Sequence, residues 1–188
     1  LLVLGSSNLD EALRGYFTKY DCSSADINPI GSLSKSIIRN LLVFSAKKFD
    51  APMLKEIAGS PASPELQPIA EKSADGSATP VPRNPQDSEA EMGMTFDELD
   101  LFGRLRIEQR CGPLSMYMKL VRTWSHKSAA EVADKVKCFF RHYSVNRHKM
   151  STLTVAVHSG NHSPDDHRFD LRQVIYNTQW PWQFKAID

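Results

Sequence analysis

The sequence predicts an α/β fold in which strands of a parallel sheet come at the start and the C-terminal half is mainly helical. Residues 1–4 are a short apolar run without alternation, as in a parallel strand that is covered on both faces. After a small polar turn, Asn8 and Glu11 have the spacing of a capping box, and apolar residues then recur at helical intervals as far as Tyr20. The chain therefore opens with a strand, a turn and a helix.

A second unit of the same kind follows. Residues 27–30 fit a short edge strand limited by Pro29, and residues 34–48 return to helical spacing after a polar loop. The order strand, helix, strand, helix is typical of α/β domains.

The composition changes over residues 58–90. Six prolines stand between residues 61 and 85, among Ser, Ala, Asp and Glu and with few apolar side chains. We expect residues 69–84 to form a disordered insertion within a longer loop. The insertion interrupts the chain without dividing it, so residues 1–188 are predicted to be one domain.

Beyond the insertion the pattern is helical almost to residue 149. Two more capping boxes predict helix starts, formed by Thr95 with Glu98 and by Ser128 with Glu131. Between them, the Gly-Pro pair at residues 112–113 ends one helix near residue 110 and begins another over residues 114–124.

Composition excludes several classes of protein. With 188 residues, 41% hydrophobic and 24% charged, the chain can build one ordinary core, and its net charge of +1 argues against a general affinity for nucleic acid. It has no run of about 18 apolar residues that would cross a membrane. Cys22, Cys111 and Cys138 are far apart in the sequence, which favours reduced thiols over disulfides. We expect a cytoplasmic protein with neither a membrane nor a nucleic-acid partner.

The start of the first helix is the first candidate site. Ligands of open α/β sheets bind beyond the carboxyl ends of the strands, where free backbone N–H groups of a helix meet phosphate. Ser6 would lie there. Glu11 would either close the capping box or hold a divalent cation between itself and a phosphate.

Two basic features have similar alternatives. Lys35 lies in the first turn of its helix, where the helix dipole disfavours a cation, so it is either a solvated lysine or part of an anion site. Residues 135–149 hold five Lys or Arg and two His with no acid. That run could contact nucleic acid, bind a dinucleotide phosphate or form a solvated helical face.

The segment "HSGNHSPDDH", residues 158–167, has the composition of a loop, and its His158 and His162 are spaced as two metal ligands could be. Spacing alone is weak support for a metal site there. The P-loop, dinucleotide-binding and zinc-protease motifs are all missing from these 188 residues.

Five blocks of sequence together carry a resemblance to a known family: "LGSSNLDEALRGYFTKYDCSSADINPIGSLSK", "EMGMTFDELDLFGRLR", "CGPLSMYMKLVRTW", "NRHKMSTLT" and "RFDLRQVIYNTQWPWQF". They closely resemble the C-terminal part of eukaryotic glutamine-dependent NAD synthetases, over nearly the whole chain except residues 69–84. The resemblance implies part of a Rossmann-like adenine-nucleotide α-hydrolase fold, a parallel sheet with helices on both faces.

The resemblance also implies an activity. The family uses ATP to activate the carboxylate of deamido-NAD as an adenylate, and ammonia derived from glutamine then displaces AMP to give NAD. By local match, the implied ATP contacts are Ser6, Lys35 and Ser63. The implied deamido-NAD contacts are Lys19, Asp26, His148 and Lys149, and Glu11 matches a Mg²⁺ ligand. No residue of the chain matches a catalytic nucleophile, and His162 and His167 match no motif of the family.

Two elements of the family lie outside these residues: the phosphate loop with its second metal-binding aspartate, and the glutaminase domain. We therefore expect residues 1–4 to pair with strands encoded upstream. We expect the isolated chain to be inactive, and either poorly soluble or homo-oligomeric. The alternative is a truncated, inactive isoform or interaction module that associates with the full-length synthetase.

Overall fold

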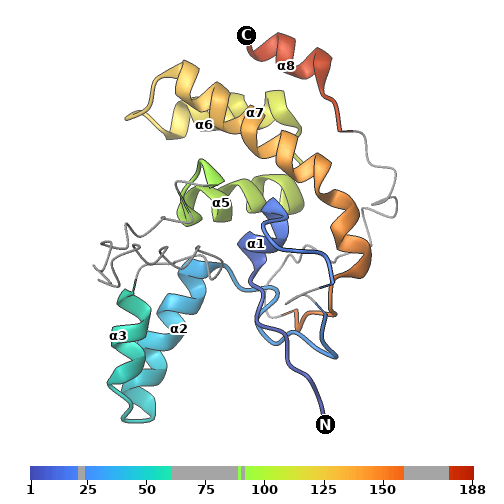
Figure 1. Cartoon of the computed structure of the whole chain (residues 1–188). Helices are drawn as coiled ribbons and strands as arrows, with labels where there is room; N and C mark the ends of the chain where they lie inside the picture. The colour runs from blue at the N-terminus through green and yellow to red at the C-terminus, as the bar shows by residue number, and fades with distance from the viewer. Residues whose placement is uncertain (21–23, 61–88, 90–91, 159–177) are drawn as a thin grey trace, which may run out of the picture.

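The computed structural model describes residues 1–20, 24–60, 89, 92–158 and 178–188. Along the chain its helices are α1 (Leu9–Arg14), α2 (Lys35–Lys48), α3 (Met53–Gly59), α5 (Phe96–Gly103), α6 (Pro113–Thr123), α7 (Ala129–Val145) and α8 (Pro181–Ile187) (Figure 1). A π-helical turn, η1 (Arg104–Glu108), continues α5, and a 3₁₀ turn, η2 (Arg147–Thr152), follows α7. The predicted insertion, residues 69–84, lies outside the described residues.

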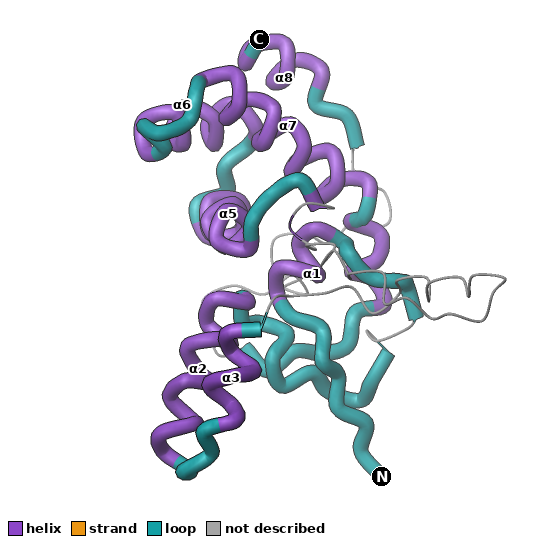
Figure 2. Tube along the Cα trace, turned by 60° about the vertical axis from the view of Figure 1, so that its left-hand side comes forward, coloured by secondary structure: helices purple, strands orange, loops and turns teal. Residues whose placement is uncertain are grey.

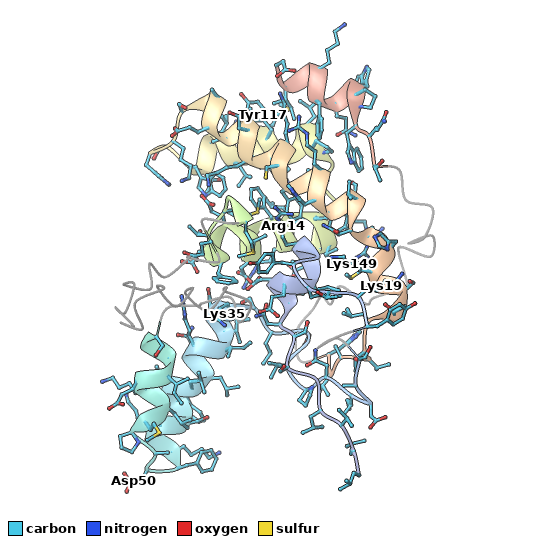
Figure 3. All side chains as sticks on the ribbon, in the orientation of Figure 1. Arg14, Lys19, Lys35, Asp50, Tyr117 and Lys149 are labelled. Atoms are coloured by element: carbon cyan, nitrogen blue, oxygen red, sulfur yellow. The ribbon has the colours of Figure 1, made fainter. Side chains whose placement is uncertain are left out.

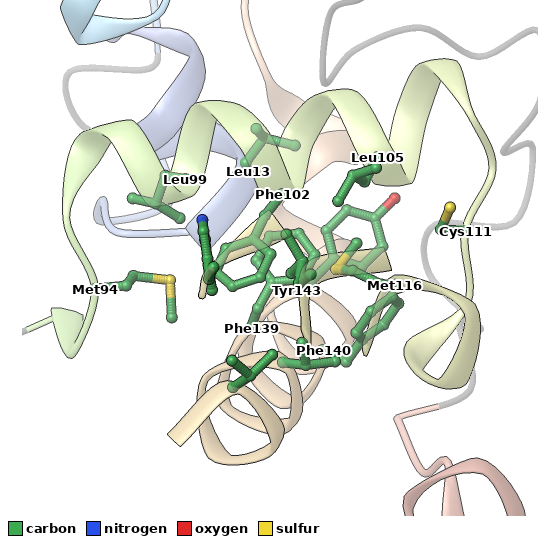
Figure 4. Close-up of a cluster of buried hydrophobic side chains, with 14 of the residues drawn as sticks. Leu13, Met94, Leu99, Phe102, Leu105, Cys111, Met116, Phe139, Phe140 and Tyr143 are labelled. Atoms are coloured by element: carbon green, nitrogen blue, oxygen red, sulfur yellow. The ribbon is translucent and has the colours of Figure 1, made fainter. Parts of the chain in front are cut away.

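Aromatic side chains of α5 and α7 form the centre of the core. Phe102 stacks on Phe139 with ring centroids 4.8 Å apart, and Trp124 meets Phe102 edge-on at 5.7 Å. Leu9 and Leu13 of α1 are buried in the same cluster (Figure 4). Burying an aromatic or leucine side chain contributes about 1.5–3 kcal/mol, so this cluster fixes α1 against α5 and α7.

Three extended segments lie side by side in parallel. Leu4 pairs with Ile27, and Asn28 pairs with Ala156. The Gly5 N–H donates to the Ile27 carbonyl at 2.8 Å, and the Asn28 N–H donates to the Val155 carbonyl at 2.9 Å. The predicted parallel arrangement is thus confirmed as isolated bridges, whereas the described residues contain no continuous strand (Figure 2).

The prediction that residues 1–4 are covered on both faces is wrong for the described structure. Leu2, Val3 and Leu4 are each more than half exposed. The backbone of these residues is bonded to the segment around Asp26 and Ile27. Their exposure shows that no helix among the described residues covers them.

The first helix is shorter than its apolar pattern suggests, since α1 ends at Arg14 instead of continuing to Tyr20. Gly15 adopts the left-handed conformation at φ 69°, and the N–H of Tyr16 donates to the Glu11 carbonyl at 2.9 Å. A glycine in this conformation is a common helix stop. Lys19 therefore lies in a loop beyond the helix.

The other predicted helices are confirmed within a residue or two at each end. The three predicted capping boxes are present, with both reciprocal bonds at Asn8–Glu11, Thr95–Glu98 and Ser128–Glu131. Helix α6 begins at Pro113, where its missing N–H is not needed.

Helices α2 and α3 pack on each other as a hairpin that stands away from the aromatic core (Figure 2). Ile37, Leu41 and Phe44 share one face of α2 and are 40%, 46% and 59% exposed. Contiguous exposed apolar surface of this kind marks contact sites.

Within the described residues, no helix combines the length and apolar character needed to cross a membrane. Cys111 and Cys138 are free thiols, Cys111 buried and Cys138 half-buried. Cys22 lies outside the described residues.

Glu98 joins the start of α5 to α7. Its carboxylate accepts the Thr95 N–H at 2.9 Å and pairs with Lys135 at 2.8 Å and Lys127 at 3.1 Å. Burial alone would raise the pKa of Glu98, but the hydrogen bonds from Lys135, Thr95 and Lys127 outweigh it and hold the pKa below its ordinary value.

We predict that Glu98→Gln lowers the free energy of unfolding by about 1–2 kcal/mol at pH 7, because glutamine keeps the cap but loses both ion pairs. A carboxylate with a lowered pKa stabilises the fold above its unfolded pKa of 4.5, and this stabilisation is lost as pH falls through the folded pKa. Urea unfolding should therefore show a larger difference at pH 7 than at pH 3. Glu131→Gln, at an exposed capping box of the same kind, should have a smaller effect, and equal losses in the two variants would contradict the role given to the lysines.

Candidate functional site

The turn before α1 is held by the two segments beside it. The Asn28 side chain donates to the Ser7 carbonyl at 2.7 Å, and the Leu9 N–H donates to the Leu33 carbonyl at 3.0 Å. Ser7 and Asn28 are buried, while Ser6 is exposed. The turn therefore presents the Ser6 side chain to solvent on a fixed backbone.

Glu11 has the structural role that the capping pattern predicts. Its carboxylate accepts the Asn8 backbone N–H at 3.2 Å and the Asn8 side-chain amide at 2.8 Å, and Asn8 caps the Glu11 N–H in return at 3.0 Å. Glu11 is half-buried. In this structure the Glu11 carboxylate therefore closes the cap through both Asn8 groups.

Asp10 connects the first turn of α1 to the start of α2. It is fully buried, and its Oδ2 accepts the backbone N–H of Lys35 at 2.7 Å. Burial raises the pKa of Asp10 to about 7; the Lys35 N–H opposes the shift, and the nearby Asp100 and Glu11 add to it. Sequence reasoning missed Asp10, because on paper it is one more acidic residue in a helix first turn.

Lys35 is the first residue of α2, and its backbone N–H is bound by Asp10 of α1 (Figure 3). It is half-buried, and its ammonium group lies 5.7 Å from the centre of the Phe96 ring of α5. The ring face and the Asp10 carboxyl both favour a cation here, which explains how a lysine is tolerated at a helix start.

Lys149 lies at the opposite end of α1. Its ammonium donates to the carbonyls of Gly15 at 2.6 Å and Phe17 at 2.7 Å, and the Asn146 side chain donates to the Arg14 carbonyl at 3.1 Å. Burial and the nearby Arg14 lower the pKa of Lys149. Lys149 therefore fixes the backbone that follows α1.

The other residues predicted to contact deamido-NAD are Lys19, His148 and Asp26. Lys19 is half-buried beside the Tyr20 ring, whereas His148 is exposed. Asp26 is exposed and accepts the Val3 N–H at 2.8 Å. It lines an open pocket of about 500 Å³ together with Val3, Ser24, Ala25, Thr152, Leu153, Thr154 and Val155.

The predicted residues thus form two groups. Glu11 and Lys35 lie toward the start of α1, and Lys19 and Lys149 lie beyond its end. Ser63 lies outside the described residues.

The loop with the candidate metal ligands is also largely outside the described residues. His158 is exposed at the last described position before it, and His162 and His167 lie beyond. Across the part of the chain that the structure describes, no group of three His, Cys, Asp or Glu side chains is placed to hold a metal ion.

Comparison with known proteins identifies the family. A family described as NAD synthase matches residues 1–152. The chain belongs to the NAD synthase family. It is 54% identical to the glutamine-dependent NAD(+) synthetase of Mus musculus, 53% to that of Arabidopsis thaliana and 52% to that of Homo sapiens, each over the whole chain. The chain spans about a quarter of the length of these relatives, 25%, 24% and 25% respectively.

A solved structure supports the fold. The crystal structure of a glutamine-dependent NAD(+) synthetase from Cytophaga hutchinsonii matches the whole chain with a TM-score of 0.70 at 22% identity, over 26% of that protein. The chain therefore has the fold of one part of an NAD synthetase, and the predicted family resemblance is confirmed.

We predict that Gly15→Ala lowers the free energy of unfolding by about 2–4 kcal/mol. Alanine is strained at φ 69°, and its Cβ would lie only 2.2 Å from the Cβ of Asn146. Urea denaturation measures the loss. Gly59→Ala is the matched control, because nothing lies within 4 Å of its added Cβ and helix propensity favours alanine there. Equal stability of Gly15→Ala and the wild type would contradict the close packing of α1 on Asn146.

Proposed function

We propose that this chain is the C-terminal part of a synthetase domain that converts deamido-NAD to NAD in the cytoplasm, using ATP and ammonia released from glutamine. The family match carries the proposal. The placement of Glu11 and Lys35 toward one end of α1 and of Lys19 and Lys149 toward the other adds support, because ATP and deamido-NAD must bind together. The domain would have the Rossmann-like adenine-nucleotide α-hydrolase fold.

The proposed reaction has two steps. A carboxylate oxygen of deamido-NAD attacks the α-phosphorus of ATP, and pyrophosphate leaves. Ammonia then attacks the acyl carbon, AMP leaves, and the carboxylate has become an amide. A carboxylate is a poor acyl donor, so adenylation supplies the leaving group that the second step needs.

The residues of this chain would bind and orient the two substrates. Ser6, Lys35 and Ser63 would contact ATP, and Lys35 would offset negative charge on its phosphates. Lys19, Asp26, His148 and Lys149 would contact deamido-NAD. Holding two reactants in register is itself a large part of catalysis.

Glu11 fits a Mg²⁺ site to which the described residues contribute one carboxylate. Magnesium is usually held by one or two carboxylates together with substrate phosphate oxygens, which agrees with a single half-buried glutamate at the start of a helix. When bound, Mg²⁺ would neutralise charge developing on the pyrophosphate.

The test uses a chimaera in which this chain replaces the matching quarter of the Mus musculus synthetase. We predict that the chimaera makes NAD from deamido-NAD, ATP and ammonia, and that Glu11→Gln lowers its kcat/KM by about a hundredfold or more. Glutamine can still close the capping box, so the substitution separates the cap from the cation ligand. Coupled detection of NAD measures the rates.

The control is Glu56→Gln, on the exposed side of α3, which should leave activity unchanged. A chimaera that makes no NAD while folding normally would contradict the proposed function. An active Glu11→Gln chimaera would contradict only the role of Glu11 as a metal ligand.

We also propose that the chain forms homo-oligomers through the exposed α2 face of Ile37, Leu41 and Phe44. Light scattering coupled to size-exclusion chromatography should show a mass above 21.1 kDa that falls toward this value in the Phe44→Asp variant. His126→Asp, an exposed change away from this face, is the control. A monomer at every concentration tested would contradict the proposal.

A further inference from the structure

Asp10 is a buried acid to which the proposed reaction gives no role. It is 0% exposed, and its Oδ1 has no hydrogen-bond partner. An acidic side chain with an unpaired buried oxygen costs stability, so the position is not explained by stability alone.

The oxygen that does have a partner is bound to the start of α2. Lys35 is the first residue of that helix, and its N–H is one of the backbone donors that a helix leaves without an internal acceptor. Ser34, the residue before it, caps the Ile37 N–H at a long 3.4 Å. The 2.7 Å bond to Asp10 is therefore the shorter of these two restraints on the first turn of α2.

Helix α2 also has no acidic residue in its own first turn. The hydrogen-bond acceptor at this helix start is instead supplied by α1, through the Asp10 carboxyl. Since the Leu9 N–H binds the Leu33 carbonyl at 3.0 Å, two neighbouring residues of α1 hold the segment that leads into Lys35.

We propose that Asp10 is a positioning residue for ATP. By accepting the Lys35 N–H, Asp10 fixes the start of α2, and therefore the Lys35 side chain, relative to Glu11, the next residue of α1. This inference rests on the proposed function for the ATP contact of Lys35. Its geometric part, that Asp10 fixes the start of α2, does not.

Two substitutions with the same branching pattern separate the loss of the acceptor from the loss of the side chain. Asp10→Asn keeps a carbonyl oxygen that can accept the Lys35 N–H, whereas Asp10→Leu fills the same space with methyl groups and accepts nothing. In the chimaera, we expect Asp10→Leu to raise the KM for ATP about tenfold and to change kcat less than about threefold, and Asp10→Asn to restore the KM to within about threefold of wild type.

The matched control is Asp97→Ala. Asp97 lies on α5 and accepts the hydroxyl of Ser36 at 2.6 Å, so the variant removes another carboxylate bond to α2 without touching the Lys35 N–H. Its KM for ATP should change less than about twofold.

Hydrogen exchange of the Lys35 amide, measured by NMR on the 188-residue chain, tests the geometric part without any activity. We expect this amide to exchange at least about tenfold faster in Asp10→Leu than in Asp10→Asn. Equal exchange in the two variants would overturn the inference even if the chimaera is active. A KM for ATP in Asp10→Leu equal to that of the wild type would also overturn the inference, and so would an equally large rise of this KM in Asp97→Ala. If the wild-type chimaera is inactive but the Lys35 amide exchanges faster in Asp10→Leu than in Asp10→Asn, only the proposed function is contradicted.

Discussion

The six-residue helix α1 is held at both of its ends, and the segments around it take their positions from these contacts. A helix this short is not stable by itself, so its position must come from tertiary contacts. Leu9 and Leu13 pack into the aromatic cluster of α5 and α7, Asp10 meets the start of α2, and Lys149 takes up the carbonyls that follow the helix. The segments that carry Lys35, His148 and Lys149 are thus positioned by contacts with this short helix and the residues that follow it.

Two kinds of interaction hold α1 in place. The apolar side of α1 supplies most of the free energy, since burial of aromatic and leucine side chains is favourable without regard to direction. The polar side supplies geometry, because hydrogen bonds of 2.6–2.7 Å from Lys35, Lys149 and Asn28 fix how these segments face one another. The proposed site would have to hold ATP and deamido-NAD in register, and for that the second kind of restraint matters more than the first.

Local sequence patterns predict the helix starts correctly, whereas features that depend on contacts between distant segments are predicted less well. Capping boxes at Asn8, Thr95 and Ser128 follow from three-residue spacings, and all are present. The end of α1 was misjudged because the apolar period runs on past Gly15, although the glycine and its contact with Asn146 stop the helix. Parallel pairing was predicted, but the length of the paired segments depends on neighbours that no local pattern reveals. For the candidate site, family resemblance selected the residues, and the structure alone brought in Asp10.

Lys35 shows how a broken local rule becomes informative. A cation in the first turn of a helix opposes the helix dipole, and within α2 nothing compensates for it. The compensation lies in other elements, in the Asp10 carboxyl of α1 and the Phe96 ring of α5. A lysine that the dipole of its own helix disfavours is thus held by groups of two other helices. Departures of this kind from local rules are typical of functional sites, which agrees with the proposed contact of Lys35 with ATP.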